Sequence, residues 1–272
     1  NRQASGDVYT EDILYDYYSY VQVGGTGFRL TAGTPTRNYT NNTISSNGEF
    51  TGSNGNMINW NTTSSISGNI FTNVFTFTAS QGTLGDLRLF QYLDEDVQGV
   101  SDDIFFTRGS VAAGNLELFT VDNSEVYGVS HGGAYSASQG LVNATFAGWA
   151  ANSYNNMKGA IANGTQAISE TGVIDNLPPF THSVVGPAYG LTQDIVSALA
   201  WEVIGTETTA TIITTLGGVP DITDIPDDDP PAVSVLIIKD RTAHNANGHI
   251  AEVGCGRAAR RHAHRHAVSA CG

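Results

Sequence analysis

The sequence predicts an all-β fold, a large antiparallel β-sandwich of two sheets, followed by a C-terminal linker and tail. Apolar and polar residues alternate with a period of two over short runs, which is typical of half-buried strands. Turn-forming Gly and Asn residues interrupt these runs about every eight to twelve residues, which favours a sandwich or a barrel. The number of strands exceeds that of an immunoglobulin-like domain, so we expect extra hairpins at the rim. Two smaller sandwiches joined near residue 130 are the structural alternative.

The first clear strands lie in the N-terminal half of the chain. Residues 69–78 place Phe71, Phe75 and Phe77 on one face and Thr side chains mainly on the other. Aromatic and β-branched residues suit a pleated, half-buried surface. Residues 86–93 form a second strand, with apolar residues on both faces near its end.

Further elements follow along the chain. Residues 116–121 form another strand, and residues 152–162 are the one plausible helix, since their apolar residues fall near helical spacing. Residues 195–203 and 209–216 are predicted to pair as the two strands of a hairpin around Gly205. The first of these two strands should direct four apolar side chains inward: Ile195, Leu199, Trp201 and Val203.

Composition divides the chain into four regions. Residues 1–219 are the predicted sandwich body, and residues 220–231 are a linker rich in Pro and Asp. Residues 232–240 are an apolar terminal strand, and residues 241–272 are a basic, His-rich tail that we expect to be disordered. The linker, the apolar strand and the tail therefore form a terminal part of the chain that is separate from the body.

The charge of the body excludes several partners. Residues 1–238 hold 6 Arg or Lys against 24 Asp or Glu, which gives −18, and residues 239–272 hold 6 against 2, which gives +4. An acidic body repels nucleic acid and anionic membrane surfaces. No run of about 18 apolar residues is present, so we expect no membrane span in this chain.

Composition also indicates the compartment. Lys158 and Lys239 are the two lysines of the sequence, which is otherwise rich in Thr, Asn and Gly. This composition suits an exported bacterial or archaeal protein, located outside the cell or on its surface. The chain begins at Asn1 without a leader, so we expect that a signal peptide has been removed or that the sequence is a fragment.

Two segments carry a resemblance to a known family. Leu87 to Asp103 reads "LRLFQYLDEDVQGVSDD", and Asp194 to Gly217 reads "DIVSALAWEVIGTETTATIITTLG". An aromatic strand with an acidic end, then an apolar strand ending in Trp-Glu and a Thr-rich strand, resembles the ectodomains of PEP-CTERM-type bacterial surface proteins. The resemblance implies export, a supersandwich-like fold, and an ectodomain class that mostly lacks an assigned activity. The tail departs from the family, because it has neither the Pro-Glu-Pro motif nor the apolar membrane segment.

The strongest candidate for a metal site is an acidic stretch. Ca²⁺ takes six to eight oxygen ligands, and a loop with five carboxylates could supply several. The spacing does not match an EF-hand. A solvated turn at a strand end is the other interpretation, and structural calcium is the one cofactor that the sequence suggests. The five candidate ligands are Asp94, Glu95, Asp96, Asp102 and Asp103.

Other motifs bear on catalysis, sugar binding and glycosylation. His131, in a Ser-His-Gly-Gly turn, and His182 are the two histidines of the body, and no nucleophile-elbow motif accompanies them. The tyrosines Tyr15, Tyr17, Tyr18 and Tyr20 could stack on sugars or simply form a first strand. Five glycosylation sequons begin at Asn38, Asn41, Asn61, Asn143 and Asn163.

The apolar terminal strand suggests assembly. It could complete its own sheet, or it could insert into a neighbouring copy and build a fibre. We therefore expect a non-enzymatic structural protein of the cell surface that self-associates. A carbohydrate-binding module or adhesin for extracellular polysaccharide is the alternative, and a polysaccharide-active enzyme is a third. The residues of the candidate assembly strand are Val233, Val235, Leu236, Ile237 and Ile238.

Overall fold

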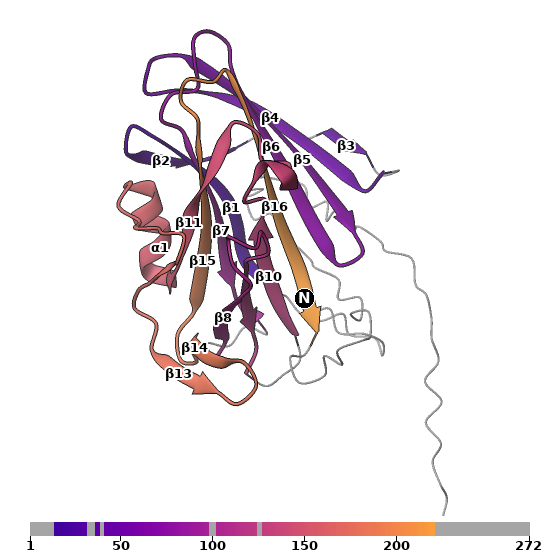
Figure 1. Cartoon of the computed structure of the whole chain (residues 1–272), viewed down its shortest axis with the longest axis vertical. Coiled ribbons are helices and arrows are strands. Elements are labelled where there is room, and N and C mark those ends of the chain that lie inside the picture. Colours follow the sequence, from indigo (N-terminus) through magenta and orange to yellow (C-terminus); the bar gives the residue numbers. More distant parts are fainter. Residues whose placement is uncertain (1–13, 32–35, 39–40, 98–101, 124–126, 221–272) are drawn as a thin grey trace, which may run out of the picture.

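Two β-sheets lie face to face in the computed structural model, which describes residues 14–31, 36–38, 41–97, 102–123 and 127–220 (Figure 1). The six-stranded sheet has the order β12-β11-β15-β7-β1-β2 and the ten-stranded sheet the order β13-β14-β8-β9-β10-β16-β6-β5-β4-β3. The predicted all-β sandwich of two sheets is confirmed. Neighbouring strands are antiparallel except β11 and β12, which run parallel.

The strands and helices have the following bounds. The six-stranded sheet contains β1 (Leu14–Val23), β2 (Thr26–Arg29), β7 (Arg88–Glu95), β11 (Ala144–Ser153), β12 (Val173–Ile174) and β15 (Ile195–Val203). The ten-stranded sheet contains β3 (Thr36–Asn38), β4 (Thr43–Thr51), β5 (Met57–Ser67), β6 (Ile70–Ala79), β8 (Ile104–Arg108), β9 (Glu117–Val121), β10 (Tyr127–Gly133), β13 (Pro179–His182), β14 (Gly186–Gly190) and β16 (Thr209–Pro220). The helical elements that lie wholly within the described residues are the 3₁₀ turn η3 (Ala137–Gln139) and the helix α1 (Tyr154–Ala162).

Each sheet combines strands from both halves of the chain. β7 lies between β1 and β15 in one sheet, and β6 lies beside β16 in the other. The described residues therefore form one sandwich rather than two smaller ones joined near residue 130. The helix predicted over residues 152–162 is also present, as α1.

The predicted hairpin of residues 195–203 and 209–216 is wrong. β15 pairs with β11 and β7, whereas β16 pairs with β6 and β10, so the turn at Gly205 joins the two sheets. The physical reason is burial: nearly every residue of β15 is buried, and such a strand belongs in the middle of a layer. The prediction of its inward side chains is correct, since the four named residues all lie in the main core.

The main core lies between the sheets and is rich in aromatic residues. Phe75 and Phe77 of β6 share this core with Trp201 and Leu199 of β15, a strand of the other sheet, and all four are at most 2% exposed. Period-two alternation along β6 leaves Thr72, Thr76 and other small polar residues on the outer side of the sheet. One face of β6 therefore packs into the core, and the other face points away from it.

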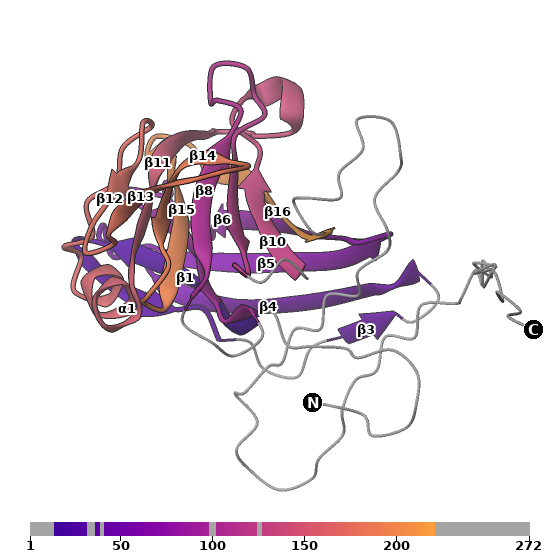
Figure 2. The same cartoon turned by 90° about the horizontal axis from the view of Figure 1, so that it is seen from below.

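Helix α1 covers part of the outer face of the six-stranded sheet, and it is seen from below in Figure 2. Met157 and Ile161 are fully buried against a second apolar cluster that includes Tyr20, Phe90 and Tyr92. No helix among the described residues has the length and apolar character needed to cross a membrane. The linker, the assembly strand and the tail, residues 221–272, lie outside the described residues.

Candidate functional site

The five predicted calcium ligands are divided by the geometry of β7. Asp94 and Glu95 are consecutive strand residues, so their side chains point to opposite faces of the sheet. Asp94 lies on the α1 side, directly across from Asp16, and Glu95 points into the sandwich. Asp103 is buried and accepts a hydrogen bond from the backbone N–H of Val97 at 3.3 Å.

The other two predicted ligands, Asp96 and Asp102, are both half-buried. Among the described residues, no group of three or more His, Cys, Asp or Glu side chains is arranged to hold a metal ion. Residues 98–101, between the two halves of the acidic stretch, lie outside this description. The structural calcium therefore remains a prediction.

A buried polar chain links the two sheets inside the sandwich. The Ser197 hydroxyl of β15 donates to Glu95 Oε1 of β7 at 2.6 Å, and His131 Nδ1 of β10 lies 3.2 Å from the same hydroxyl oxygen. A hydroxyl has one proton, so with Ser197 donating to Glu95 its contact with His131 is completed by the tautomer that carries the ring proton on Nδ1. This order leaves His131 Nε2 as an acceptor, and it has no partner among the described residues.

Burial keeps the histidine of this chain neutral. His131 is fully buried, and burial lowers its pKa to about 3. Burial likewise raises the pKa of Glu95 well above its ordinary range, although the Ser197 hydrogen bond works in the opposite direction. A neutral His131 beside a protonated Glu95 is the state that a dry interior favours.

This arrangement differs from a catalytic triad. In a triad the histidine lies between the hydroxyl and the carboxylate, whereas here Ser197 lies between Glu95 and His131. The glycines after His131 also have a structural reason: a Cβ on Gly133 would approach Trp201 Cζ2 to 2.5 Å. His182, the other histidine of the body, lies on β13 and accepts a hydrogen bond from the backbone of Val184.

A second polar group, beside His131, also lies inside the sandwich. The ring of Tyr17 meets the ring of His131 edge to face, with centroids 6.3 Å apart. The Tyr17 hydroxyl accepts from Asn73 Nδ2 at 2.8 Å and lies 3.3 Å from Thr214 Oγ1. Ser64 extends the group by donating to Asn73 Oδ1 at 2.6 Å. These bonds tie the inner faces of β1, β5, β6 and β16 together.

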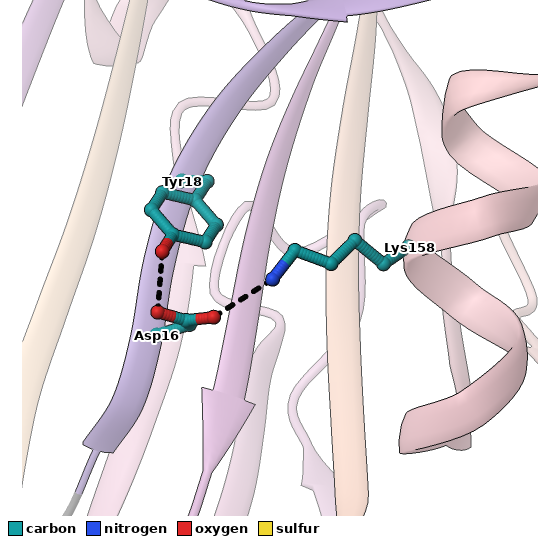
Figure 3. A network of polar contacts seen from close by, with 3 residues as sticks. All are labelled: Asp16, Tyr18 and Lys158. Carbon is teal, nitrogen blue, oxygen red and sulfur yellow. Dashed lines mark hydrogen bonds and ion pairs between the residues drawn. The ribbon is translucent and has the colours of Figure 1, made fainter. Parts of the chain in front are cut away.

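An ion pair holds α1 against the outer face of the six-stranded sheet. Figure 3 shows Asp16 between Tyr18 and Lys158, with the lysine reaching across from the helix. Lys158 Nζ lies 2.8 Å from Asp16 Oδ2, and the Tyr18 hydroxyl donates to Asp16 Oδ1 at 2.5 Å. The Asp16 side chain is 6% exposed and that of Lys158 is 35% exposed. The pair is therefore well shielded on the side of the carboxylate.

The same face carries a second carboxyl group. Burial raises the pKa of Asp94 to about 8, Asp16 adds to that increase, and Lys158 opposes it. Burial also raises the pKa of the Tyr18 hydroxyl to about 12, and its hydrogen bond to Asp16 acts in the same direction. Two acids on one face thus have different surroundings, because Asp16 touches the lysine and Asp94 Oδ2 has no partner among the described residues.

The three tyrosines of β1 whose side chains are described are divided between the two faces of the strand. Tyr17 points inward, and the side chain of Tyr15 lies outside the description. Tyr18 and Tyr20 do share the outer face, but the Arg29 guanidinium carbon lies 3.3 Å from the centroid of the Tyr18 ring. Lys158 Nζ lies 4.7 Å from the same centroid. The Tyr18 ring is thus already engaged by cations of its own chain.

The glycosylation sequons occupy varied positions. Asn41, Asn61 and Asn163 are exposed, whereas Asn143 is half-buried and donates to the backbone oxygen of Thr209. Asn38 belongs to β3, and its side chain lies outside the description. Asn61 lies in the middle of β5, so a glycan there would cover the outer face of the ten-stranded sheet.

One edge of the ten-stranded sheet is open over half a strand. β3 pairs only with Thr43–Ser45 of β4, and among the described residues β5 alone pairs with residues 46–51. Residues directly opposite each other point to the same side of a sheet. Ser46, Gly48 and Phe50 therefore point inward, because their partners on β5 are buried. Phe50 itself is half-buried, so the core is thinly covered at this edge.

The fold and these contacts define the class: a two-sheet, predominantly antiparallel β-sandwich protein with a polar interior chain. No family model matches the chain, and no curated protein matches it. A solved structure described as a bacterial glucoamylase complexed with acarbose has 13% identity and a TM-score of 0.40 over 75% of this chain. This chain covers 27% of that structure, so the likeness carries no statement about activity.

The Asp16–Lys158 pair and the interior Glu95–Ser197–His131 chain were not identified from sequence. The partners are separated by 142 residues in the first case, and by 66 and 102 residues in the second. One signal did exist for the first pair, because Lys158 is an isolated lysine on the predicted helix of a chain rich in acids.

Proposed function

We propose that the protein is a non-enzymatic structural protein, exported to the cell surface or the extracellular space, which self-associates by strand donation. The observation that carries the proposal is the edge of β4 at residues 46–51, which has no strand partner other than β5 among the described residues. Unpaired N–H and C=O groups along a strand edge are a template for another strand. The resemblance to PEP-CTERM-type surface proteins supports the same location.

The donor in this proposal is the segment of residues 233–238. Its sequence, Val-Ser-Val-Leu-Ile-Ile, is β-branched and apolar, and it matches the open edge in length at six residues. An added strand would extend the inner face over Phe50, which is half-buried and touches the ring of Phe28. Covering such apolar surface contributes about 25 cal/mol for each Å² removed from water.

The surroundings of His131 and His182 support a non-catalytic role for the protein. His131 is fully buried and neutral, and its order relative to Ser197 and Glu95 does not suit proton transfer to a nucleophile. The other histidine of the body, His182, bonds to a neighbouring turn. Catalysis by these histidines would need a different arrangement of His131, Ser197 and Glu95.

Electron microscopy of the full chain over a range of concentrations tests the proposal. Ser46→Lys places a charge on the inner side of the open edge and should abolish filaments, whereas Asn47→Lys, on the outer side of the same strand, should leave them intact. Ile237→Asp should also abolish filaments, by damaging the donor.

Mixing the two defective variants provides the decisive control. The Ser46→Lys chain keeps an intact donor and the Ile237→Asp chain keeps an intact edge, so the mixture should form dimers that cannot extend. Wild-type protein that stays monomeric at every concentration, with and without Ca²⁺, would overturn the proposal.

A further inference from the structure

The outer face of the ten-stranded sheet carries an ordered array of side chains, most of which are small, uncharged and polar. β4, β5, β6 and β16 are neighbours, and their inward residues alternate with outward ones that are exposed or half-buried. We call these outward positions the Thr/Asn face. Its members are Thr43, Ser45, Asn47 and Glu49 of β4; Asn59, Asn61, Thr63 and Ser65 of β5; Thr72, Val74, Thr76 and Thr78 of β6; and Thr209, Thr211, Ile213 and Thr215 of β16.

The pairing register arranges these residues in straight rows across the four strands. The central row consists of Asn47, Asn61, Thr76 and Thr211, each directly paired with the next. Neighbouring strands lie about 4.8 Å apart, and successive outward residues of one strand lie about 6.8 Å apart. Since β-branched side chains have restricted rotamers, the Thr hydroxyls stand on a regular grid.

The near absence of charge on this face is unusual for this chain. Residues 1–238 carry a net charge of −18, yet among the array members Glu49 is the one ionisable side chain. Glu49 lies on β4, at the margin of the array. Thr, Ser and Asn supply both donors and acceptors of hydrogen bonds, so the face complements a ligand that is neutral and rich in hydroxyl groups.

We propose that the Thr/Asn face binds a neutral polysaccharide whose chains lie side by side in an ordered surface. A periodic polymer meets the grid at many points at once, so weak single contacts add up through multivalency. The array contains no aromatic ring, so this mode differs from stacking on the tyrosines of β1. Polysaccharide binding is a function beyond self-association. It can be tested separately, because Thr76 and Thr211 lie away from the edge of β4 that the donated strand would use.

Co-sedimentation of the full chain with insoluble cellulose, chitin, curdlan and mannan tests the inference. The double variant Thr76→Val/Thr211→Val keeps the side-chain shape and removes two hydroxyl groups from the central row. We expect it to bind at least one of these polymers about tenfold more weakly than the wild type, as two lost hydrogen bonds would predict. Thr192→Val, at an exposed position outside the array, is the matched control and should bind normally.

Four outcomes would overturn the inference. They are no binding to any of the four polymers, equal binding to an anionic alginate gel, full binding by the double variant, and an effect on ice growth without polysaccharide binding. An unchanged melting temperature of the double variant establishes that any loss of binding is local. Filament formation by the same variant reports separately on self-association.

Discussion

Asp16 of β1 and Asp94 of β7 are directly paired across the six-stranded sheet, on the face that α1 covers, and both are buried. Two carboxyl groups so placed cannot both ionise without cost. Lys158 contacts Asp16 at 2.8 Å, whereas burial, and after it the charge of Asp16, raises the pKa of Asp94 to about 8. The docking of the helix on the sheet is therefore linked to the protonation of one buried acid.

We expect Asp94→Asn to weaken the pH dependence of folding stability. The pKa of Asp94 is about 8 in the folded protein and about 3.9 in an unfolded chain, so the folded state binds the extra proton between these values. Its contribution to stability is complete below about pH 4 and is lost as pH rises through about 8. Urea unfolding at about pH 5 and about pH 8 measures the change. Asp175→Asn, at an exposed position, is the control, and equal slopes for wild type and Asp94→Asn would contradict this prediction.

Lys158→Met should lower the free energy of unfolding by about 1–3 kcal/mol, because it leaves the buried Asp16 carboxylate without its cation. The matched control is Arg88→Met, which breaks the more exposed ion pair with Glu202 and should cost less than about 1 kcal/mol. Chemical denaturation of both variants gives the comparison. Similar losses of unfolding free energy in the two variants would show that the Asp16–Lys158 pair stabilises the protein no more than the exposed Arg88–Glu202 pair does.

Gly133→Ala should destabilise the protein by about 1–3 kcal/mol, because the new Cβ would collide with the Trp201 ring and with the Ile213 carbonyl oxygen, 2.9 Å away. Gly159→Ala offers a contrast within α1. A Cβ there meets nothing within 4 Å, and Ala is favoured over Gly in a helix by about 1 kcal/mol, so this variant should be more stable. Melting curves of the two variants should move in opposite directions.

Ser197→Ala should destabilise the protein by about 1–3 kcal/mol, since it removes the partner of both Glu95 Oε1 and His131 Nδ1 inside the core. The wild-type His131 ring should stay neutral down to about pH 4, because burial lowers its pKa to about 3. Ring chemical shifts recorded by NMR during an acid titration would show this. A His131 that titrates near pH 6.5, like an ordinary histidine, would disprove the buried neutral state.

Hydrophobic periodicity identified the strands but not their partners. The alternation in β6 and β15 correctly separated inward from outward residues, and the spacing of apolar residues located α1. The same periodicity could not tell that β15 and β16 enter different sheets, because a strand's pattern records how it is buried and not which neighbour buries it.

The acidic stretch shows a similar limit. Proximity in sequence suggested that Asp94 and Glu95 act together, yet a strand separates consecutive side chains onto opposite faces. Had the strand been extended to Glu95, this separation would have followed from the sequence alone. The contact of Lys158 with Asp16 could not have followed in that way, because it depends on where α1 packs against the sheet.

The place of β16 between β10 and β6 has a consequence for synthesis in the cell. Until residues up to about Pro220 have left the ribosome, the larger layer lacks its central member and consists of two separate pieces. The nascent chain must hold those pieces without a common partner, and we expect chaperones to bind it during that interval.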